Sequence, residues 1–166
     1  MKPTRKSIRL KEYDYSSCGT YFVTICTKDR KSILWERAVG AATCRPQDVP
    51  LSDYGKVVDS AITQICTHYP TVAVDHYCIM PDHIHLLLAF QAADGGRQVA
   101  APTLSTVVGQ LKRICSTQAG VSLWQKSFYD RVMRNEKEYL AAWQYIENNP
   151  LQPDTATDQP DFSNFT

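Results

Sequence analysis

The stretch "TVAVDHYCIMPDHIHLLLAF", residues 71–90, decides the fold. Two apolar runs flank Pro81 and Asp82, residue types that favour a tight turn, so the stretch predicts a β-hairpin. The second run carries His83 and His85. Alternate residues of a strand face the same way with Cα atoms about 6.6 Å apart, so both imidazoles should project together while Ile84 faces the opposite side.

The histidine pair admits two interpretations. Two imidazoles at this spacing can bind one divalent cation if a third ligand comes from elsewhere in the chain. A half-exposed strand whose polar positions happen to be histidines explains the same pattern. The chain has only four histidines, and spacing alone favours the second interpretation.

Three amphipathic segments predict helices at 51–69, 104–118 and 135–150. Ser52 is an expected N-cap and Pro70 an expected stop for the first of them. The third opens with a capping-box pair, Asn135 and Glu138. Further strands are predicted at 20–28, 32–36 and 123–133. Strands and helices interleave irregularly around a hairpin, which predicts an α+β fold with a largely antiparallel sheet.

Length and composition indicate one domain. The 166 residues, 43% hydrophobic and 21% charged, are ordinary for a soluble globular protein. We expect a domain over 1–150 and a flexible tail over 151–166, with loops at 37–50 and 91–103. The basic N-terminus lacks the apolar core of a secretory signal, which predicts a cytoplasmic protein. Six cysteines without a C-x-x-C pair predict reduced, mostly buried thiols, and neither a zinc site nor a disulfide framework.

Charge is distributed unevenly. The net charge is +1, and residues 1–150 hold all 18 basic side chains but 14 of the 17 acidic ones, giving +4. Five basic side chains form an N-terminal arm: Lys2, Arg5, Lys6, Arg9 and Lys11. The arrangement is compatible with a phosphate-binding face, and a solvated surface explains it equally well.

The last predicted helix carries chemistry on one stripe. At about 100° per residue, Tyr139, Trp143 and Ile146 share the stripe expected to face the core. Tyr145 and Asn149 lie one turn apart on a neighbouring stripe. They present a phenol and a carboxamide from adjacent turns of a rigid element, where one can attack and the other can hold a metal.

Four blocks together closely resemble one family: "MPDHIHLLL", "LKRICSTQ", "LWQKSFYDRVMRNEKEY" and "YIENNP". They are similar to REP-associated tyrosine transposases, a branch of the single-tyrosine HUH transposases, in order from about residue 13 to 152. HUH stands for His, a bulky hydrophobic residue and His, here residues 83–85. The joint match is more specific than any single motif. It favours the metal-binding interpretation of the histidine pair over the interpretation as a half-exposed strand.

The resemblance implies a ferredoxin-like domain with the HUH strand lying centrally and a metal-dependent enzyme that cuts and rejoins single-stranded DNA. It makes His83, His85 and Asn149 ligands of Mg²⁺ or Mn²⁺, and Tyr145 the nucleophile. Related insertion-sequence transposases often have Gln at the position of Asn149, whereas Asn is typical of this branch. The implied product is a 5′-phosphotyrosine with a free 3′-OH.

The implied partner is single-stranded DNA with a REP-type hairpin and a short guide sequence at its foot. The N-terminal arm is the first candidate for backbone contacts. Further basic candidates follow the predicted second helix and the strand after it: Lys112, Arg113, Lys126, Arg131 and Arg134. Tyr15, Phe128 and Tyr129 are candidates for stacking on bases. The resemblance favours a monomer and leaves a dimer open, since insertion-sequence relatives are dimers.

Three alternatives remain. A histidine-triad nucleotide hydrolase or transferase needs a third alternate histidine, and position 87 is Leu87. A domesticated REP-hairpin-binding protein without cleavage activity is the second. A structural domain with a satisfied histidine pair is the third, and the four-block match counts against it.

Overall fold

A four-stranded antiparallel sheet forms the centre of the protein, whose computed structural model describes residues 18–36, 50–92 and 101–149. Its order is β2-β3-β1-β4. The strands are β1 (Gly19–Cys26), β2 (Val72–Ile79), β3 (His83–Phe90) and β4 (Tyr129–Val132). The helices are α1 (Asp53–Thr63), α2 (Ile65–His68), α3 (Leu104–Ala119) and α4 (Glu136–Asn148), with a short 3-10 turn at Lys28–Arg30. The βαββαβ order followed by α4 confirms the predicted α+β, ferredoxin-like architecture.

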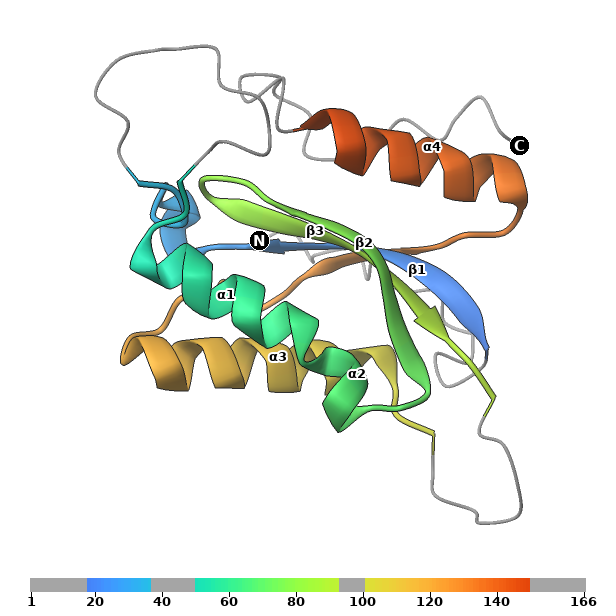
Figure 1. Cartoon of the computed structure of the whole chain (residues 1–166), viewed down its shortest axis with the longest axis horizontal. Coiled ribbons are helices and arrows are strands. Elements are labelled where there is room, and N and C mark those ends of the chain that lie inside the picture. Colours follow the sequence, from blue (N-terminus) through green and yellow to red (C-terminus); the bar gives the residue numbers. More distant parts are fainter. Residues whose placement is uncertain (1–17, 37–49, 93–100, 150–166) are drawn as a thin grey trace, which may run out of the picture.

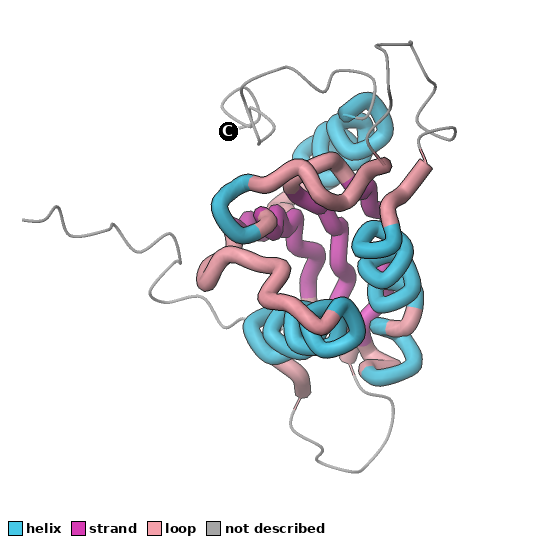
Figure 2. Tube along the Cα trace, turned by 90° about the vertical axis from the view of Figure 1, so that its left-hand side faces the viewer, coloured by secondary structure: helices cyan, strands magenta, loops and turns pink. Residues whose placement is uncertain are grey.

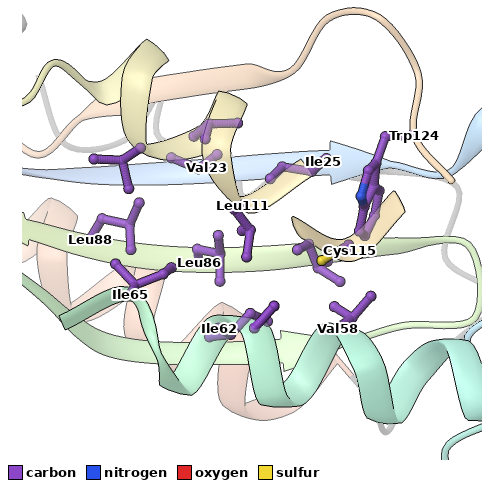
Figure 3. Close-up of a cluster of buried hydrophobic side chains, with 14 of the residues drawn as sticks. Val23, Ile25, Val58, Ile62, Ile65, Leu86, Leu88, Leu111, Cys115 and Trp124 are labelled. Atoms are coloured by element: carbon purple, nitrogen blue, oxygen red, sulfur yellow. The ribbon is translucent and has the colours of Figure 1, made fainter. Parts of the chain in front are cut away.

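One face of the sheet is covered by α1, α2 and α3 (Figure 1). Alternation along the strands directs Val23, Ile25, Ile84, Leu86 and Leu88 to this side, and all five are fully buried. Figure 3 shows Val23, Ile25, Leu86 and Leu88 meeting the side chains of the three helices in one continuous apolar layer. We call this side the α1–α3 face.

The other face of the sheet is covered by α4 (Figures 1 and 2). Its apolar cluster is smaller and centres on Phe22, Met80, Leu87, Ala142 and Ile146, all of them buried. We call this side the α4 face. Leu86 and Leu87 are adjacent in sequence and enter different clusters, as a period of two requires.

The predicted hairpin is present. Strands β2 and β3 flank the turn at Pro81-Asp82, and the Met80 amide donates to the carbonyl of His83 at 2.8 Å. The pairing register shifts between Val74 and His76, which oppose Leu88 and Leu87. Asp75 is therefore an extra residue on β2, an edge strand, in the position of a β-bulge.

The strand predicted over 32–36 is wrong. Only Trp35 forms a bridge, to Leu51. The main chain of Leu34 instead crosses the strand ends, donating to the carbonyl of Pro81 and accepting from the amide of Ser52, both at 3.0 Å. Apolar composition predicted burial here correctly, since Leu34 is fully buried, but the sheet offers this segment no neighbouring strand.

The strand predicted over 123–133 forms only at Tyr129–Val132. Its first part bridges Thr27 through Trp124. Lys112 of α3 then places its Nζ 2.8 Å from the carbonyl oxygen of Gln125 and 3.0 Å from that of Ser127. These carbonyls accept from a side chain and not from a neighbouring strand. Strand pairing with β1 therefore begins only at Tyr129.

The predicted helices are present with altered ends. The first is divided at Gln64 into α1 and α2, and the N-cap is confirmed because Ser52 Oγ accepts from the Gly55 amide at 3.1 Å. Asn135 caps α4, accepting from the Glu138 amide at 2.9 Å. The Glu138 carboxylate does not return the bond to Asn135 as a capping box would. It accepts from the Arg134 amide, at 2.9 Å.

The two chain segments that flank residues 37–49 are held together. The amide of Glu36 donates to the carbonyl of Pro50 at 2.9 Å, beside the Trp35–Leu51 bridge. Helix α1 packs closely against the first of these segments. A Cβ on Gly55 would lie 2.1 Å from the Leu34 carbonyl oxygen. Only glycine fits there.

Five cysteines lie in the described residues, and all are free. Cys78 and Cys115 are buried whereas Cys18 and Cys66 are exposed, so the expectation of mostly buried thiols holds for only part of the set. Within the described ranges, no helix has the length and apolar character needed to cross a membrane. The N-terminal arm, the tail over 151–166 and most of the two predicted loops lie outside the described residues.

Candidate functional site

The two histidines of β3 lie side by side on the α4 face. Their Nε2 atoms are 3.1 Å apart, and their rings meet at 75°. His83 is 7% exposed and His85 is fully buried. The prediction that both imidazoles project together is confirmed.

Each histidine is held by its other ring nitrogen. Nδ1 of His83 lies 2.6 Å from Oδ1 of Asp82, and Nδ1 of His85 lies 2.9 Å from Oγ1 of Thr24 on β1. A carboxylate only accepts, so Nδ1 of His83 donates to Asp82, and in a neutral ring Nε2 is then the nitrogen with the lone pair. The Thr24 hydroxyl both donates and accepts, so it is compatible with either tautomer of His85. Such partners orient ligating histidines in metalloproteins.

A second layer supports Asp82. Nε of Arg30 lies 3.0 Å from Oδ2 of Asp82, and its Nη1 lies 2.8 Å from Sγ of Cys26. Arg30 and the preceding Asp29 have positive φ angles of 54° and 57°. Non-glycine residues adopt this region at a cost, and such strain concentrates at functional sites.

Burial keeps His85 neutral. Loss of solvent, then the neighbouring His83 and Arg30, hold the pKa of His85 well below its usual 6.5. Neutral imidazole is the form that binds metals. The α4 face therefore presents one histidine that stays neutral, with one ring nitrogen able to act as a ligand, throughout the physiological pH range.

Helix α4 brings Tyr145 to the histidines. The Tyr145 ring meets the His85 ring at 73°, with centroids 5.3 Å apart, and contacts Phe22 at 6.0 Å. Asn149 caps the C-terminal end of α4, one turn beyond Tyr145. Its Nδ2 is buried and has no hydrogen-bond partner among the described residues.

The predicted core stripe of α4 is confirmed at Ile146 and wrong at Tyr139 and Trp143. The buried side chains are Glu138, Ala142 and Ile146, while Tyr139 and Trp143 are half-exposed. The helix is rotated so that its two aromatic residues reach β2 and not the middle of the sheet. Periodicity identified the stripes but contained nothing to say which of them faces inward.

The residues fit a divalent cation in part. Ligand nitrogens about 2.1 Å from an ion and at right angles to each other are about 3 Å apart, close to the observed Nε2 separation. In the described part of the chain, no group of three His, Cys, Asp or Glu side chains is arranged so that it could hold a metal ion. A further ligand must therefore be an amide such as Asn149, water or substrate oxygen. His and amide ligands suit Mn²⁺ at least as well as Mg²⁺.

The predicted DNA-contact residues fall into three groups. Lys2, Arg5, Lys6 and Arg9 lie outside the described residues. Arg113, Lys126 and Arg134 are exposed. Lys112 and Arg131 already have internal partners: main-chain carbonyls hold Lys112, and Nη2 of Arg131 lies 3.0 Å from Oε1 of Glu138.

The residues missed from the sequence are those that orient the histidines. Asp82 stands next to His83, and an acidic residue there was a readable signal. Thr24 and Arg30 are more than fifty residues away from the pair. Thr24 meets His85 only because β1 and β3 pair in the observed register, which opposes these two residues.

Comparisons with known proteins complete the description. No family model matches the chain. An uncharacterised protein of Haemophilus influenzae is 31% identical, with 89% of this chain and 88% of that protein covered. A second protein of Haemophilus influenzae, provisionally named a REP-associated tyrosine transposase, is 30% identical over 84% of this chain and 74% of its own. A solved REP-associated tyrosine transposase bound to a REP hairpin has a TM-score of 0.61 at 20% identity, over 86% of this chain and 74% of that one, and shows the same fold.

Proposed function

The chain belongs to the family of REP-associated tyrosine transposases, and we propose that it cleaves and rejoins single-stranded DNA at REP-type hairpins through Tyr145. In the proposed reaction, Tyr145 is the nucleophile and His83, His85 and Asn149 hold a divalent metal. A relative bound to a REP hairpin supports the choice of substrate.

One observation carries the proposal: the two Nε2 atoms converge at 3.1 Å while both Nδ1 atoms are held from behind. Buried rings need such partners in any case, but here the partners occupy the two Nδ1 atoms and leave the two Nε2 atoms directed at each other. The Tyr145 ring packs against one of these histidines. A nucleophile beside a prepared ligand pair is what metal-assisted attack on a phosphodiester requires.

The reaction balances without an added co-reactant. The phenol oxygen of Tyr145 attacks the scissile phosphorus, and the bond from phosphorus to the 3′ oxygen breaks. The phenol proton leaves to solvent and the departing oxygen becomes a 3′-OH. Attack by a 3′-OH on the phosphotyrosine reverses the step and restores the tyrosine, so strands are rejoined without ATP.

The protein's own contribution is placement. Asp82 and Thr24 fix the ring orientations, and α4 fixes the phenol. A tyrosine has an ordinary pKa of about 10 and is a weak nucleophile at neutral pH. A divalent metal, when bound, would favour attack by neutralising charge on the phosphate and orienting it.

The basic candidates serve DNA binding in this proposal. The N-terminal arm with Arg113, Lys126 and Arg134 offers cations for backbone phosphates. Lys112 and Arg131 act more indirectly, because the first shapes the loop before β4 and the second pairs with a buried glutamate.

The decisive experiment is a search for the covalent intermediate. Labelled single-stranded hairpin DNA is incubated with the protein and Mn²⁺, and denaturing gels report a protein–DNA adduct. Tyr145→Phe should abolish the adduct and retain hairpin binding. Tyr54→Phe, on α1 at the opposite face of the sheet, is the matched control and should still form it.

Two results would contradict the proposal. An adduct that persists in Tyr145→Phe removes the nucleophile assignment and moves suspicion to Tyr139. Tight binding by the unaltered protein with no adduct on any REP hairpin favours the binding protein without cleavage.

A further inference from the structure

A second set of contacts on α4 serves none of the steps above. Tyr139, Trp143 and Glu147 follow one another at four-residue intervals, so they form a single stripe on the helix. All three contact β2, the edge strand of the sheet, and none contacts the histidine pair in the described structure.

The β2 side of this contact is built from two consecutive residues. The Tyr139 hydroxyl donates to Oδ2 of Asp75 at 3.2 Å. The His76 ring stacks on Trp143 with centroids 4.3 Å apart and planes 11° apart, and its Nε2 lies 2.9 Å from Oε2 of Glu147. These five residues are named the α4 seat.

The bulge in β2 makes the α4 seat possible. Neighbouring residues of a regular strand point to opposite faces, so Asp75 and His76 could not both reach one helix. The extra residue at the register shift between Val74 and His76 removes that alternation. Edge bulges commonly re-aim side chains beside active sites.

Directional contacts outside the α4 seat hold the buried stripe of α4 at its first turn, where Arg131 of β4 and the Arg134 amide bind the Glu138 carboxylate. Further along the stripe, Ala142 and Ile146 make apolar contacts, which are non-directional and define the rotation of the helix less strictly. Tyr145 lies on one side of the buried stripe and the seat stripe on the other. A roll of the helix about its axis would therefore move the seat and the Tyr145 phenol together.

We infer that the α4 seat positions the nucleophile: Asp75 and His76, through Tyr139, Trp143 and Glu147, set the rotation of α4 that places the Tyr145 phenol against His85. Asp75 and His76 are positioning residues and touch neither DNA nor metal. The inference rests on the proposed function for its catalytic consequence, whereas the placement of Tyr145 is measurable without catalysis.

The test uses fluorine NMR of the full chain with 3-fluorotyrosine at its nine tyrosines. The Tyr145 resonance is the one absent from Tyr145→Phe. The disruptive variants are His76→Ala alone and Asp75→Ala/His76→Ala. Asp75→Asn/His76→Phe keeps an acceptor and an aromatic stack, and His68→Ala on α2 is the matched histidine control.

We expect the Tyr145 resonance to lose the ring-current shift from His85 and Phe22 in both disruptive variants. The conservative double variant should restore it and His68→Ala should leave it unchanged. Single-turnover adduct formation should fall by about 10- to 100-fold in the disruptive variants, as a misplacement near 1 Å predicts, with hairpin affinity unchanged.

An unmoved Tyr145 resonance in a folded His76→Ala variant would overturn the inference. So would equal losses of hairpin affinity and adduct rate, because a general loss of structure would explain them. Absence of an adduct from the unaltered protein is a different failure: it removes the proposed function, and the fluorine shifts then decide the α4 seat alone.

Discussion

The two faces of the sheet have different compositions and different tasks. The α1–α3 face is a broad apolar layer that closes over Ile84, Leu86 and Leu88. The α4 face has a small apolar cluster, and its buried side chains include Thr24, His83, His85 and Glu138. One face contributes most of the hydrophobic stabilisation, which allows the other to bury polar groups that cost stability.

The largest expected effect comes from a substitution on the α4 face, and it is on metal binding and adduct formation. His83→Ala removes one of two convergent nitrogens, so Mn²⁺ binding by calorimetry should disappear and adduct formation should fall by at least about 10³-fold. The unfolding transition should remain cooperative, since the α1–α3 face is untouched. An unchanged Mn²⁺ titration would show that His83 is not a ligand.

The next prediction compares the faces directly. Leu86 and Leu87 are adjacent and both fully buried, but they enter opposite clusters. Chemical denaturation should give a loss of about 3–5 kcal/mol for Leu86→Ala and about 2–3 kcal/mol for Leu87→Ala. Adduct formation per folded molecule should fall only in Leu87→Ala, which loosens the layer beneath α4. Equal catalytic losses would mean that the faces are not separate in function.

A smaller effect concerns pH. Burial acts to raise the pKa of Glu138, but hydrogen bonds from the Arg134 amide and Arg131, with the charges of both arginines, outweigh it and bring the pKa below its usual 4.5. The folded state thus prefers the ionised form, and the resulting stabilisation is present above about pH 4.5 and lost as the pH falls further.

Glu138→Gln should therefore lower the free energy of unfolding by about 1–3 kcal/mol at pH 7. Denaturation series at several pH values should show this difference shrinking below about pH 4.5, where the unaltered Glu138 becomes protonated too. A difference that stays constant down to pH 3 would mean that the lowered pKa contributes nothing.

The smallest expected effect concerns a residue that contacts the Nδ1 atom of a histidine. Thr24→Val keeps the shape of the side chain and removes the hydroxyl 2.9 Å from Nδ1 of His85. Mn²⁺ affinity should fall by about tenfold, because the ring loses the group that fixes its orientation. Thr63→Val, at an exposed site on α1, is the control. Equal affinities in the two variants would assign Thr24 to packing alone.

The sequence was informative wherever local chemistry determined structure. Period-two alternation placed His83 and His85 on one face, and the caps at Ser52 and Asn135 were identified from residue type alone. Both features depend on neighbours within a few residues.

Features that depend on pairing across the fold were not predictable. The partner of His85 depends on the register of β1 against β3, and the inward stripe of α4 depends on a bulge that adds one residue to β2. The segment at 32–36 had the composition of a strand, yet strand formation also needs a free edge, which composition does not describe.

The closure between Glu36 and Pro50 has a consequence for how this domain can change. The described residues on either side of positions 37–49 are joined at one point, and Gly55 of α1 packs closely against the Leu34 carbonyl beside it. Lengthening a segment whose ends are already joined adds little closure entropy and transmits no displacement to the strands. We therefore expect that sequence inserted between Glu36 and Pro50, such as a reporter or a binding module, would leave the histidines and Tyr145 in place.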